Sequence, residues 1–267
     1  MKNKQYIFLI TVLVIISCGN VSSETNFINN TDSTEIKLTE PVLKLSNAKK
    51  VSEITPPVGY ARKNTTPYGK WIRNIKLTEE NIVYYYNGSK KNNQNIHVAV
   101  LDFDIGNRNL QQCADACMRI RAEYLFENKR YSEIRFLFAS GEWAPSYAKY
   151  TTKRSRKSFR SYMNYVYAYA NTASLKKQLK SVKVKDIKIG DVFVQSGNPY
   201  GHAVTVMDVV TNENGNKKFM LSQSYMPAQS IEILINPKNN SAWYSADFEG
   251  DLVTPEWTFT NEDLKRF

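Results

Sequence analysis

Residues 187–210 read IKIGDVFVQSGNPYGHAVTVMDVV, and they decide the fold class. Two runs rich in β-branched and aromatic residues, 187–194 and 202–210, flank a segment of Ser, Gly, Asn and Pro that is typical of a turn. Another turn and two more apolar runs follow, at residues 212–216, 219–225 and 230–234. Because Gly and Asn tolerate the backbone angles of tight turns, the sequence predicts that these neighbouring strands pair as an antiparallel meander.

Two stretches before this meander have the spacing of helices. Apolar side chains recur every three to four residues in 109–126 (NLQQCADACMRIRAEYLF), with Asn107 or Asn109 placed to cap the first turn. The same spacing recurs in 158–179. Both stretches are therefore predicted to be amphipathic helices.

Three shorter segments are predicted to form strands. Residues 84–89 (YYYNGS) enter an Asn-Gly turn, residues 97–104 are the predicted partner strand, and residues 132–140 are a further strand. Since the helices come first and a run of neighbouring strands second, we expect an α+β fold. Its N-terminal helices are expected to pack on one side of a mostly antiparallel sheet.

The first eighteen residues have the layout of a secretory signal. Lys2 and Lys4 precede an apolar run over 6–16 that is too short to span a bilayer, and small residues follow. The segment 15–18 (IISC) resembles the lipobox of bacterial lipoproteins, in which the cysteine is acylated and becomes the first residue after cleavage. The resemblance implies that Cys18 anchors the exported chain to an envelope membrane, at the outer membrane or a periplasmic face. The alternative is an ordinary cleaved signal in which Cys18 is incidental.

The chain after the signal divides into a tether and a domain. Residues 19–55 are rich in Ser, Thr, Asn and Lys and lack a sustained apolar period, which predicts a disordered tether. Pro56 and Pro57 mark the expected start of the fold, and residues 56–267 have the size of a single globular domain.

The net charge favours anionic partners. The chain has a formal charge of +11, and losing Lys2 and Lys4 with the signal leaves 34 basic and 25 acidic residues, or +9. For an exported protein the candidates are membrane lipid headgroups, anionic glycans and the carboxylates of cell-wall peptides. Nucleic acid is not expected as a partner, because export separates the chain from it and no nucleic-acid-binding motif occurs.

Cysteine and histidine are scarce in this chain. Apart from Cys18, only Cys113 and Cys117 are cysteines, and a bridge between residues one helical turn apart would distort the helix. With His97 and His202 as the only histidines, the sequence predicts neither a metal site nor a cofactor.

Cys113 and His202 are the residues best placed for chemistry. Cys113 lies in the first turn of its predicted helix, where backbone N–H groups and the helix dipole lower a thiol pKa and favour the nucleophilic thiolate. His202 begins a predicted strand directly after Gly201, where its ring can face a helix end and serve as general base. The alternative interpretation is a core thiol and a strand-edge histidine that only pack, because the apolar period places Cys113 on the buried face of its helix.

The order of these motifs resembles the papain-like NlpC/P60 and CHAP amidases. Gln112-Cys113 opens a helix, 190–194 (GDVFV) forms a strand, and 201–206 (GHAVTV) starts the next strand, in the same order as in those domains. The resemblance implies a papain-like fold and a cysteine hydrolase in which Cys113 attacks a carbonyl carbon and His202 transfers the proton. This chain departs from many NlpC/P60 domains at residue 112, which is Gln in place of Asp.

The papain-like interpretation needs a residue that orients the imidazole. Pairing the strand of His202 with the next strand brings the segment from Gln223 to Tyr225 opposite the histidine. Gln223 is the predicted orienting residue, and Ser224 is the second choice. The side chain of Gln112 and the backbone N–H of Cys113 are the predicted oxyanion donors.

A closer resemblance covers nearly the whole domain. Segments such as 109–116 (NLQQCADA), 223–230 (QSYMPAQS) and 254–259 (TPEWTF) are similar to an uncharacterised family of bacterial lipoproteins, the domain of unknown function 4846. That resemblance implies the compartment and the domain boundaries, and it implies no activity.

Three functions remain open at this point. The first is a lipid-anchored cysteine hydrolase of the cell envelope that cleaves an amide, in cell-wall peptide or another acyl-amide substrate, without a cofactor. The second is a binding or scaffold lipoprotein that keeps the papain-like shell without turnover. The third is an accessory lipoprotein of a secretion or surface system, for which the basic surface is the contact.

Overall fold

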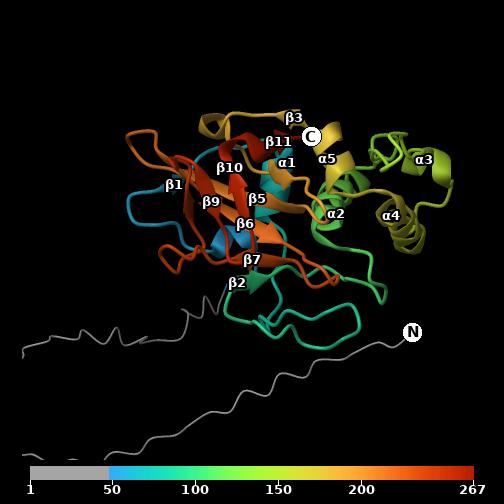
Figure 1. Cartoon of the computed structure of the whole chain (residues 1–267), viewed down its shortest axis with the longest axis horizontal. Helices are drawn as coiled ribbons and strands as arrows, with labels where there is room; N and C mark the ends of the chain where they lie inside the picture. Colours follow the sequence, from blue (N-terminus) through green and yellow to red (C-terminus); the bar gives the residue numbers. More distant parts are fainter. Residues whose placement is uncertain (1–47) are drawn as a thin grey trace, which may run out of the picture. The chain divides into compact units, whose positions relative to one another are not determined.

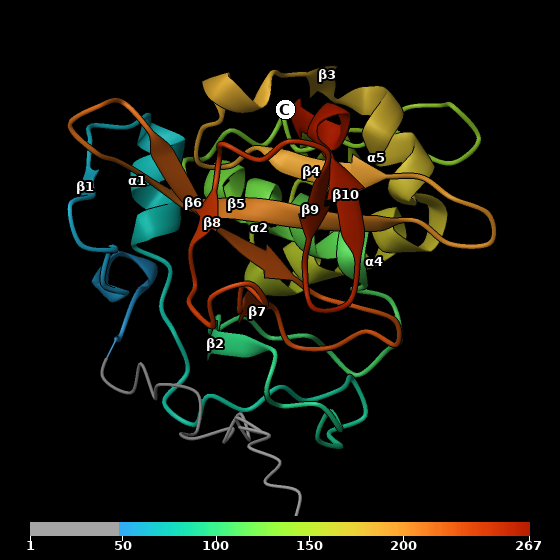
Figure 2. The same cartoon turned by 60° about the vertical axis from the view of Figure 1, so that its left-hand side comes forward.

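The computed structural model describes residues 48–267, which form an α+β fold around a nine-stranded sheet (Figure 1, Figure 2). Residues 1–47, with the predicted signal, Cys18 and most of the predicted tether, lie outside the described residues. Within the described part of the chain, the strand pairs of this sheet are antiparallel. The predicted α+β class with a mostly antiparallel sheet is confirmed.

The predicted meander forms the middle of the sheet. Four strands lie side by side in chain order: β4 (Val192–Gln195), β5 (His202–Thr211), β6 (Lys217–Gln223) and β7 (Glu232–Leu234). The turn between β5 and β6 is closed by the N–H of Asn212, which donates to the carbonyl of Asn216 at 3.0 Å. Local turns therefore determine this part of the topology, as predicted.

Shorter strands extend or flank the meander. They are β1 (Ala61–Arg62), β2 (His97–Val100), β3 (Lys180–Ser181), β8 (Tyr244–Ser245), β9 (Asp251–Val253), β10 (Thr258–Thr260) and β11 (Leu264–Arg266). β2 adds to β7 at one side of the meander, and β11 adds to β4 at the other. β9 and β10 form a separate two-stranded hairpin.

The strand predicted over residues 84–89 is wrong, and so is its pairing with the strand predicted over 97–104. Gly88 does close a turn there, with a φ of 83°. The segment nevertheless forms only isolated bridges, such as the one between Tyr85 and Gln229. β2 pairs instead with β7, so its partner comes from much later in the chain.

The strand predicted over residues 132–140 is also wrong. The segment forms one isolated bridge, between Leu137 and Trp143. Its apolar residues are buried in the core, and the hydroxyl of Tyr162 donates to the carbonyl of Ile134 at 2.9 Å. The segment is therefore a loop whose side chains Ile134, Phe136 and Leu137 are buried and whose backbone accepts a hydrogen bond from a helix side chain.

The described residues contain five α-helices and three short 3₁₀ segments. They are α1 (Pro67–Arg73), α2 (Cys113–Glu127), α3 (Tyr147–Tyr150), α4 (Arg156–Tyr169), α5 (Thr172–Gln178), and the 3₁₀ turns Val51–Glu53, Val184–Asp186 and Asn261–Asp263. The single helix predicted over 158–179 is in fact α4 and α5. The chain is extended at Ala170, and Asn171 accepts from the N–H of Ser174 at 2.9 Å to begin the second helix.

α2 confirms the first predicted helix, with a different cap. Gln112 holds the N-cap position, and Asp115 accepts from its backbone N–H at 3.1 Å. Neither Asn107 nor Asn109 caps the helix. The side-chain oxygen of Asn109 accepts from the N–H of Ala228 at 2.8 Å. Asn109 therefore binds a distant loop and does not cap its own helix.

The sheet is packed on both faces (Figure 2). Ala203 of β5 packs in a cluster with residues of α2 and α4, whereas Val204 and Val206 pack with Phe259 of the β9–β10 hairpin. Because side chains alternate along a strand, odd-numbered residues at the start of β5 face the helices and even-numbered residues face the hairpin. Helices α1, α2 and α5 contact the strands and cover one face of the sheet, so the helices lie on one side as predicted.

Residues 50–55, predicted to end the tether, are part of the folded domain. Val51 and Ile54 are buried in the core, and the N–H of Val51 donates to the carbonyl of Ile75 at 3.1 Å. Two apolar side chains attach this polar segment to the core, so the fold begins earlier than predicted. None of the described helices has the length and apolar character needed to cross a membrane.

Candidate active site

The thiol of Cys113 lies against the main chain at the start of β5. Cys113 is the first residue of α2, and its Sγ is 3.9 Å from the carbonyl oxygen of Gly201. The backbone N–H of Ala203 also hydrogen-bonds toward the sulfur. Gly201 also lies close to the end of β4. A Cβ at Gly201 would be 2.3 Å from the carbonyl oxygen of Gln195, so this position requires glycine. The sulfur therefore touches the main chain on both sides of His202.

Burial raises the pKa of the Cys113 thiol to about 12. Cys113 is 4% exposed, and the carboxyl of Asp115 raises the thiol pKa further, whereas backbone N–H groups such as that of Ala114 lower it. Loss of solvation outweighs the effect of the helix N-terminus. The predicted lowering of the thiol pKa is therefore wrong for this conformation, and the thiol is neutral at pH 7.

The imidazole of His202 lies on the hairpin face of β5. It is fully buried among the rings of Tyr225, Trp257 and Phe259, whose centroids lie 4.9, 5.4 and 5.9 Å from its own. Burial lowers the pKa of His202 to about 4, and the hydrogen bond with Gln223 only partly opposes this. The imidazole is therefore neutral at pH 7.

Gln223 lies beside His202, as the hairpin geometry predicted. Nε2 of His202 is 2.8 Å from Oε1 of Gln223. Because an amide oxygen only accepts, Nε2 carries the ring proton and Nδ1 keeps a free lone pair. Nδ1 is buried and has no hydrogen-bond partner within residues 48–267. Ser224, the second choice, donates instead to the carbonyl of Gln111 at 3.0 Å.

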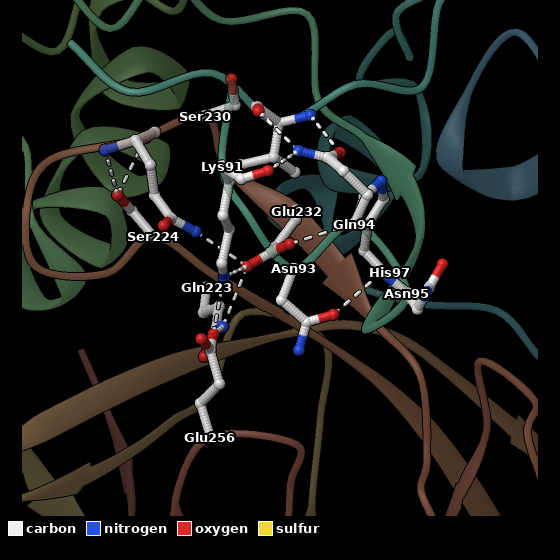
Figure 3. Close-up of polar contacts among 12 residues, drawn as sticks. Lys91, Asn93, Gln94, Asn95, His97, Gln223, Ser224, Ser230, Glu232 and Glu256 are labelled. Carbon is white, nitrogen blue, oxygen red and sulfur yellow. Dashed lines mark hydrogen bonds and ion pairs between the residues drawn. The ribbon is translucent and has the colours of Figure 1, made fainter. Parts of the chain in front are cut away.

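Two carboxylates fix the orientation of the Gln223 amide (Figure 3). Its Nε2 donates to Oε1 of Glu232 at 3.0 Å and to Oε2 of Glu256 at 2.6 Å. Only the NH₂ end of an amide can donate to two acceptors, so the oxygen end faces His202. The carboxylates thus orient the amide, and the amide selects the tautomer of the imidazole.

Lys91 joins the same two carboxylates, and we call Lys91, Glu232 and Glu256 the charged cluster. Nζ of Lys91 lies 2.8 Å from Glu232 and 2.7 Å from Glu256. Burial raises the pKa of Glu232, but donors that include His97, Lys91 and Gln223 outweigh it, so this pKa lies below its usual value. Glu232 is therefore a buried anion at pH 7, and sequence analysis missed it together with its two partners.

Tyr225 is close to both the thiol and the imidazole and also reaches solvent. Its ring is tilted by 56° against that of His202, and its centroid lies 5.9 Å from Nζ of Lys91. Burial raises the pKa of its hydroxyl, and the charges of Glu256 and Cys113 raise it further. Tyr225 is half-buried, whereas the two groups beside it are almost completely buried. In this conformation the site is closed, and the open cleft expected from the sequence is not formed around these residues.

Gln112 is bonded within its own turn. Its Nε2 donates to Oδ1 of Asn109 at 3.1 Å, and its backbone N–H donates to Asp115. The backbone N–H of Cys113 begins α2 and has no acceptor inside the helix. Of the two predicted oxyanion donors, the structure therefore places the N–H of Cys113 beside the thiol and leaves the Gln112 amide engaged elsewhere.

Cys113, His202 and Gln223 thus meet at the start of β5, but the thiol and the imidazole form no hydrogen bond. Sγ contacts the main chain of residues 201–203 from the helix face of the strand, and the ring of His202 lies on the hairpin face. The two predicted side chains therefore lie at the same end of β5 but on different faces of the strand.

A family model covers almost all of the described structure. Its description is a domain of unknown function (4846), and it matches residues 51–266. The match begins at Val51, which is also where buried side chains begin. No curated protein and no solved structure matches the chain. By this match over most of its length, the chain belongs to the family of the domain of unknown function 4846.

Proposed function

We propose that the chain is a cysteine hydrolase that cleaves an amide, with a papain-like (NlpC/P60-like) site formed by Cys113, His202 and Gln223. The observation that supports this most is the unpaired Nδ1 of His202. A buried polar atom without a partner costs about 1–3 kcal/mol, and most buried side-chain polar atoms avoid that cost by hydrogen bonding. A general base needs this nitrogen free to accept a proton.

The reaction needs only the groups of this site and water. Sγ of Cys113 attacks the substrate carbonyl carbon while Nδ1 of His202 takes the thiol proton. The imidazolium gives that proton to the amide nitrogen, the C–N bond breaks, and the amine leaves a thioester on Cys113. Water then gives a proton to Nδ1 and attacks the thioester carbonyl. The C–S bond breaks, the acid is released, and the imidazolium returns the proton to Sγ, which restores the thiol and the neutral imidazole. Gln223 accepts from Nε2–H throughout and is a positioning residue.

Catalysis in this site requires a conformational step. The Cys113 side chain turns from the carbonyl of Gly201 toward Nδ1 of His202, and Tyr225 moves aside to admit the substrate. Exposure returns the thiol pKa toward its ordinary range. The N–H of Cys113 then stabilises the oxyanion, joined by the Gln112 amide once it leaves Asn109. The closed structure is the resting form in this proposal.

Alkylation by iodoacetamide near neutral pH tests the proposal. We expect Cys113 to react at least about 100-fold faster than Cys117, since a positioned general base contributes about 10²–10⁴-fold. Cys117 lies one turn later on α2, is equally buried, and has a thiol pKa that burial raises to about 12. It is therefore an internal reference, and peptide mass spectrometry gives both rates from one sample.

Two variants control the alkylation experiment. His202→Asn removes the base, and Gln223→Leu removes its positioning residue while leaving the ring in place. Each is expected to bring the Cys113 rate down to that of Cys117, and thermal melting checks that each variant is folded. If the two cysteines react equally in the unmodified chain, or if Cys113 is indifferent to both variants, the hydrolase proposal fails.

The burial of the site favours a second function, a binding or scaffold lipoprotein with the same shell and no turnover. A thiol with a pKa of about 12 and a fully buried imidazole suit a packing role. Slow and equal alkylation of Cys113 and Cys117 supports this function over the first.

We also propose that the chain is exported and anchored by lipid on Cys18, which lies outside the described residues. The support is the charged, apolar and small-residue order of residues 1–18 and the lipobox resemblance of its last four residues. An envelope location makes the amides of cell-wall peptide the substrate class expected for the hydrolase.

Cys18→Ala is expected to move the protein from the membrane fraction to the soluble fraction, because stable anchoring needs the acyl chains. Immunoblotting of separated fractions measures this, and Cys113→Ala is the matched cysteine control that stays in the membrane fraction. Unchanged fractionation of Cys18→Ala would refute the anchor.

A further inference from the structure

A concave region is lined by residues of α1, the C-terminal half of α2 and β11. Figure 1 shows where these elements lie in the fold. The region consists of two cavities of about 410 and 330 Å³ that share Arg121 and Phe267 as lining residues. We call the two together the basic groove. Arg121 follows Cys113 by eight residues on α2, which is about 12 Å along the helix axis. The groove is therefore separate from the candidate active site.

The basic groove carries an excess of positive charge. Five basic residues line it: Arg121, Arg130, Arg135, Lys188 and Arg266. Its carboxylate side chains are Glu133, which Arg130 holds at 2.6 Å, and Asp191, which Arg266 holds at 2.6 Å. Within residues 48–267, Arg121, Arg135 and Lys188 have no ion-pair partner. Three cations of the groove are therefore available to an anionic ligand.

Two of these guanidinium groups lie over aromatic rings. The guanidinium carbon of Arg121 lies 4.8 Å from the ring centroid of Tyr68, and that of Arg135 lies 4.4 Å from the ring of Trp143. Stacking occupies the face of a guanidinium and leaves its N–H edge free for a carboxylate or phosphate. Trp143 is 46% exposed, so it also offers an apolar ring surface at the groove.

We propose that the basic groove binds an anionic glycan, with one acidic sugar unit in each cavity. Each cavity has the volume that small ligands occupy, and two adjoining cavities match successive units of a polymer. The carboxylates of the sugars pair with the edges of Arg121 and Arg135. The apolar face of a sugar ring packs on Trp143. The binding does not rest on the proposed hydrolase activity.

Concavity favours a glycan over a bilayer surface. A flat membrane surface approaches protruding basic residues, whereas Arg121 and Phe267 lie at the junction of two hollows. Single sugar units enter such hollows, and the stacked arginines are held in place before binding, which lowers the entropy cost of association.

Calorimetric titration with an oligogalacturonate tests the site. We expect binding that weakens as salt is raised, and an affinity at least about 10-fold lower for Arg121→Gln/Arg135→Gln, since each 1.4 kcal/mol of lost pairing is tenfold. Lys157→Gln/Lys238→Gln removes the same charge from exposed positions outside the groove and is expected to leave the affinity within about twofold. Lys188→Gln is a milder groove variant if the double variant fails to fold.

Two results would overturn the proposal. One is an equal affinity of the groove variants and the unmodified chain for oligogalacturonate. The other is binding to phosphatidylglycerol vesicles that depends on Arg121 and Arg135, without oligogalacturonate binding, which assigns the groove to lipid headgroups. Cys113→Ser is expected to bind the glycan normally, so failure of the hydrolase proposal is distinguishable from failure of this one.

Discussion

Replacing Lys91 by methionine is expected to lower the free energy of unfolding by about 3–5 kcal/mol. Lys91 is 5% exposed, and its Nζ is paired with both Glu232 and Glu256. Methionine fills a similar volume but leaves the fully buried Glu232 facing Glu256 without a cation between them. Desolvated charges that lose their partner destabilise a fold far more than a surface ion pair stabilises it.

Urea denaturation followed by circular dichroism measures the effect of Lys91→Met. The matched control is Lys90→Met, which replaces the exposed lysine directly before Lys91. It is expected to change the free energy of unfolding by less than about 0.5 kcal/mol. Adding Glu232→Gln to Lys91→Met is expected to recover part of the loss because it removes the unpaired charge. A cost for Lys91→Met no larger than that for Lys90→Met would show that the charged cluster is not a stabilising element.

The charged cluster also links three separate segments to the candidate site. Lys91 comes from the loop before β2, Glu232 from β7 and Glu256 from the turn between β9 and β10. Glu232 and Glu256 both accept from Gln223, the hydrogen-bond partner of His202, and Lys91 pairs with both carboxylates (Figure 3). The ion pairs that stabilise the domain therefore hold the imidazole in its tautomer as well.

The meander and α2 could be predicted because local rules determine them. Alternating apolar runs separated by Gly and Asn turns specify neighbouring antiparallel strands, and a 3.6-residue period specifies a helix. The pairing of β2 with β7 could not be predicted in this way, since no local signal relates residues so distant in the chain. The break between α4 and α5 had a capping signal in the sequence, because Ser174 follows Asn171 by three residues. A prediction from apolar spacing alone does not detect this signal.

The candidate site could be predicted only in part, as was the case for the fold. Gln223 was found because β5 and β6 are neighbouring strands, which brings residues 223–225 near His202. The register shift between Val206 and Asp208, which fixes the exact pairing beyond it, has no signal in the turn. Lys91 and Glu256 were missed because each lies in a loop whose sequence resembles an ordinary polar turn. Glu232 left one signal, a carboxylate between apolar residues of the strand at 230–234, which indicates a buried anion and hence a partner.

The thiol pKa shows how two sequence rules can conflict. The helix start at Cys113 predicts a lowered pKa, whereas the apolar period of the same helix predicts burial and a raised one. Burial is the larger effect because the sulfur loses nearly all its water while the helix terminus contributes only partial charges. The packing of α2 against β5 buries the sulfur, and this packing determines that the thiol pKa is raised and not lowered.

Acidification from pH 6.5 to pH 4 is expected to cost the domain about 3 kcal/mol of stability through His202 alone. Burial lowers the pKa of His202 to about 4 in the folded state, against 6.5 for the unperturbed side chain. In this window the unfolded chain binds a proton that the folded chain does not. The contribution of His202 is therefore complete above pH 6.5 and is lost as pH falls toward 4.

Comparing the unmodified chain with His202→Phe isolates this contribution. Phenylalanine fits among the surrounding aromatic rings, and the hydrogen bond that it denies to Gln223 lowers stability equally at every pH. Asp115 and Asp191, whose pKa values burial raises, oppose the acid loss in both proteins and cancel in the comparison. Urea denaturation at several pH values should give a steeper pH dependence for the unmodified chain, by up to about 1.4 kcal/mol per pH unit. Parallel curves would mean that His202 has the same pKa in the folded and unfolded chain, which would contradict a fully buried imidazole.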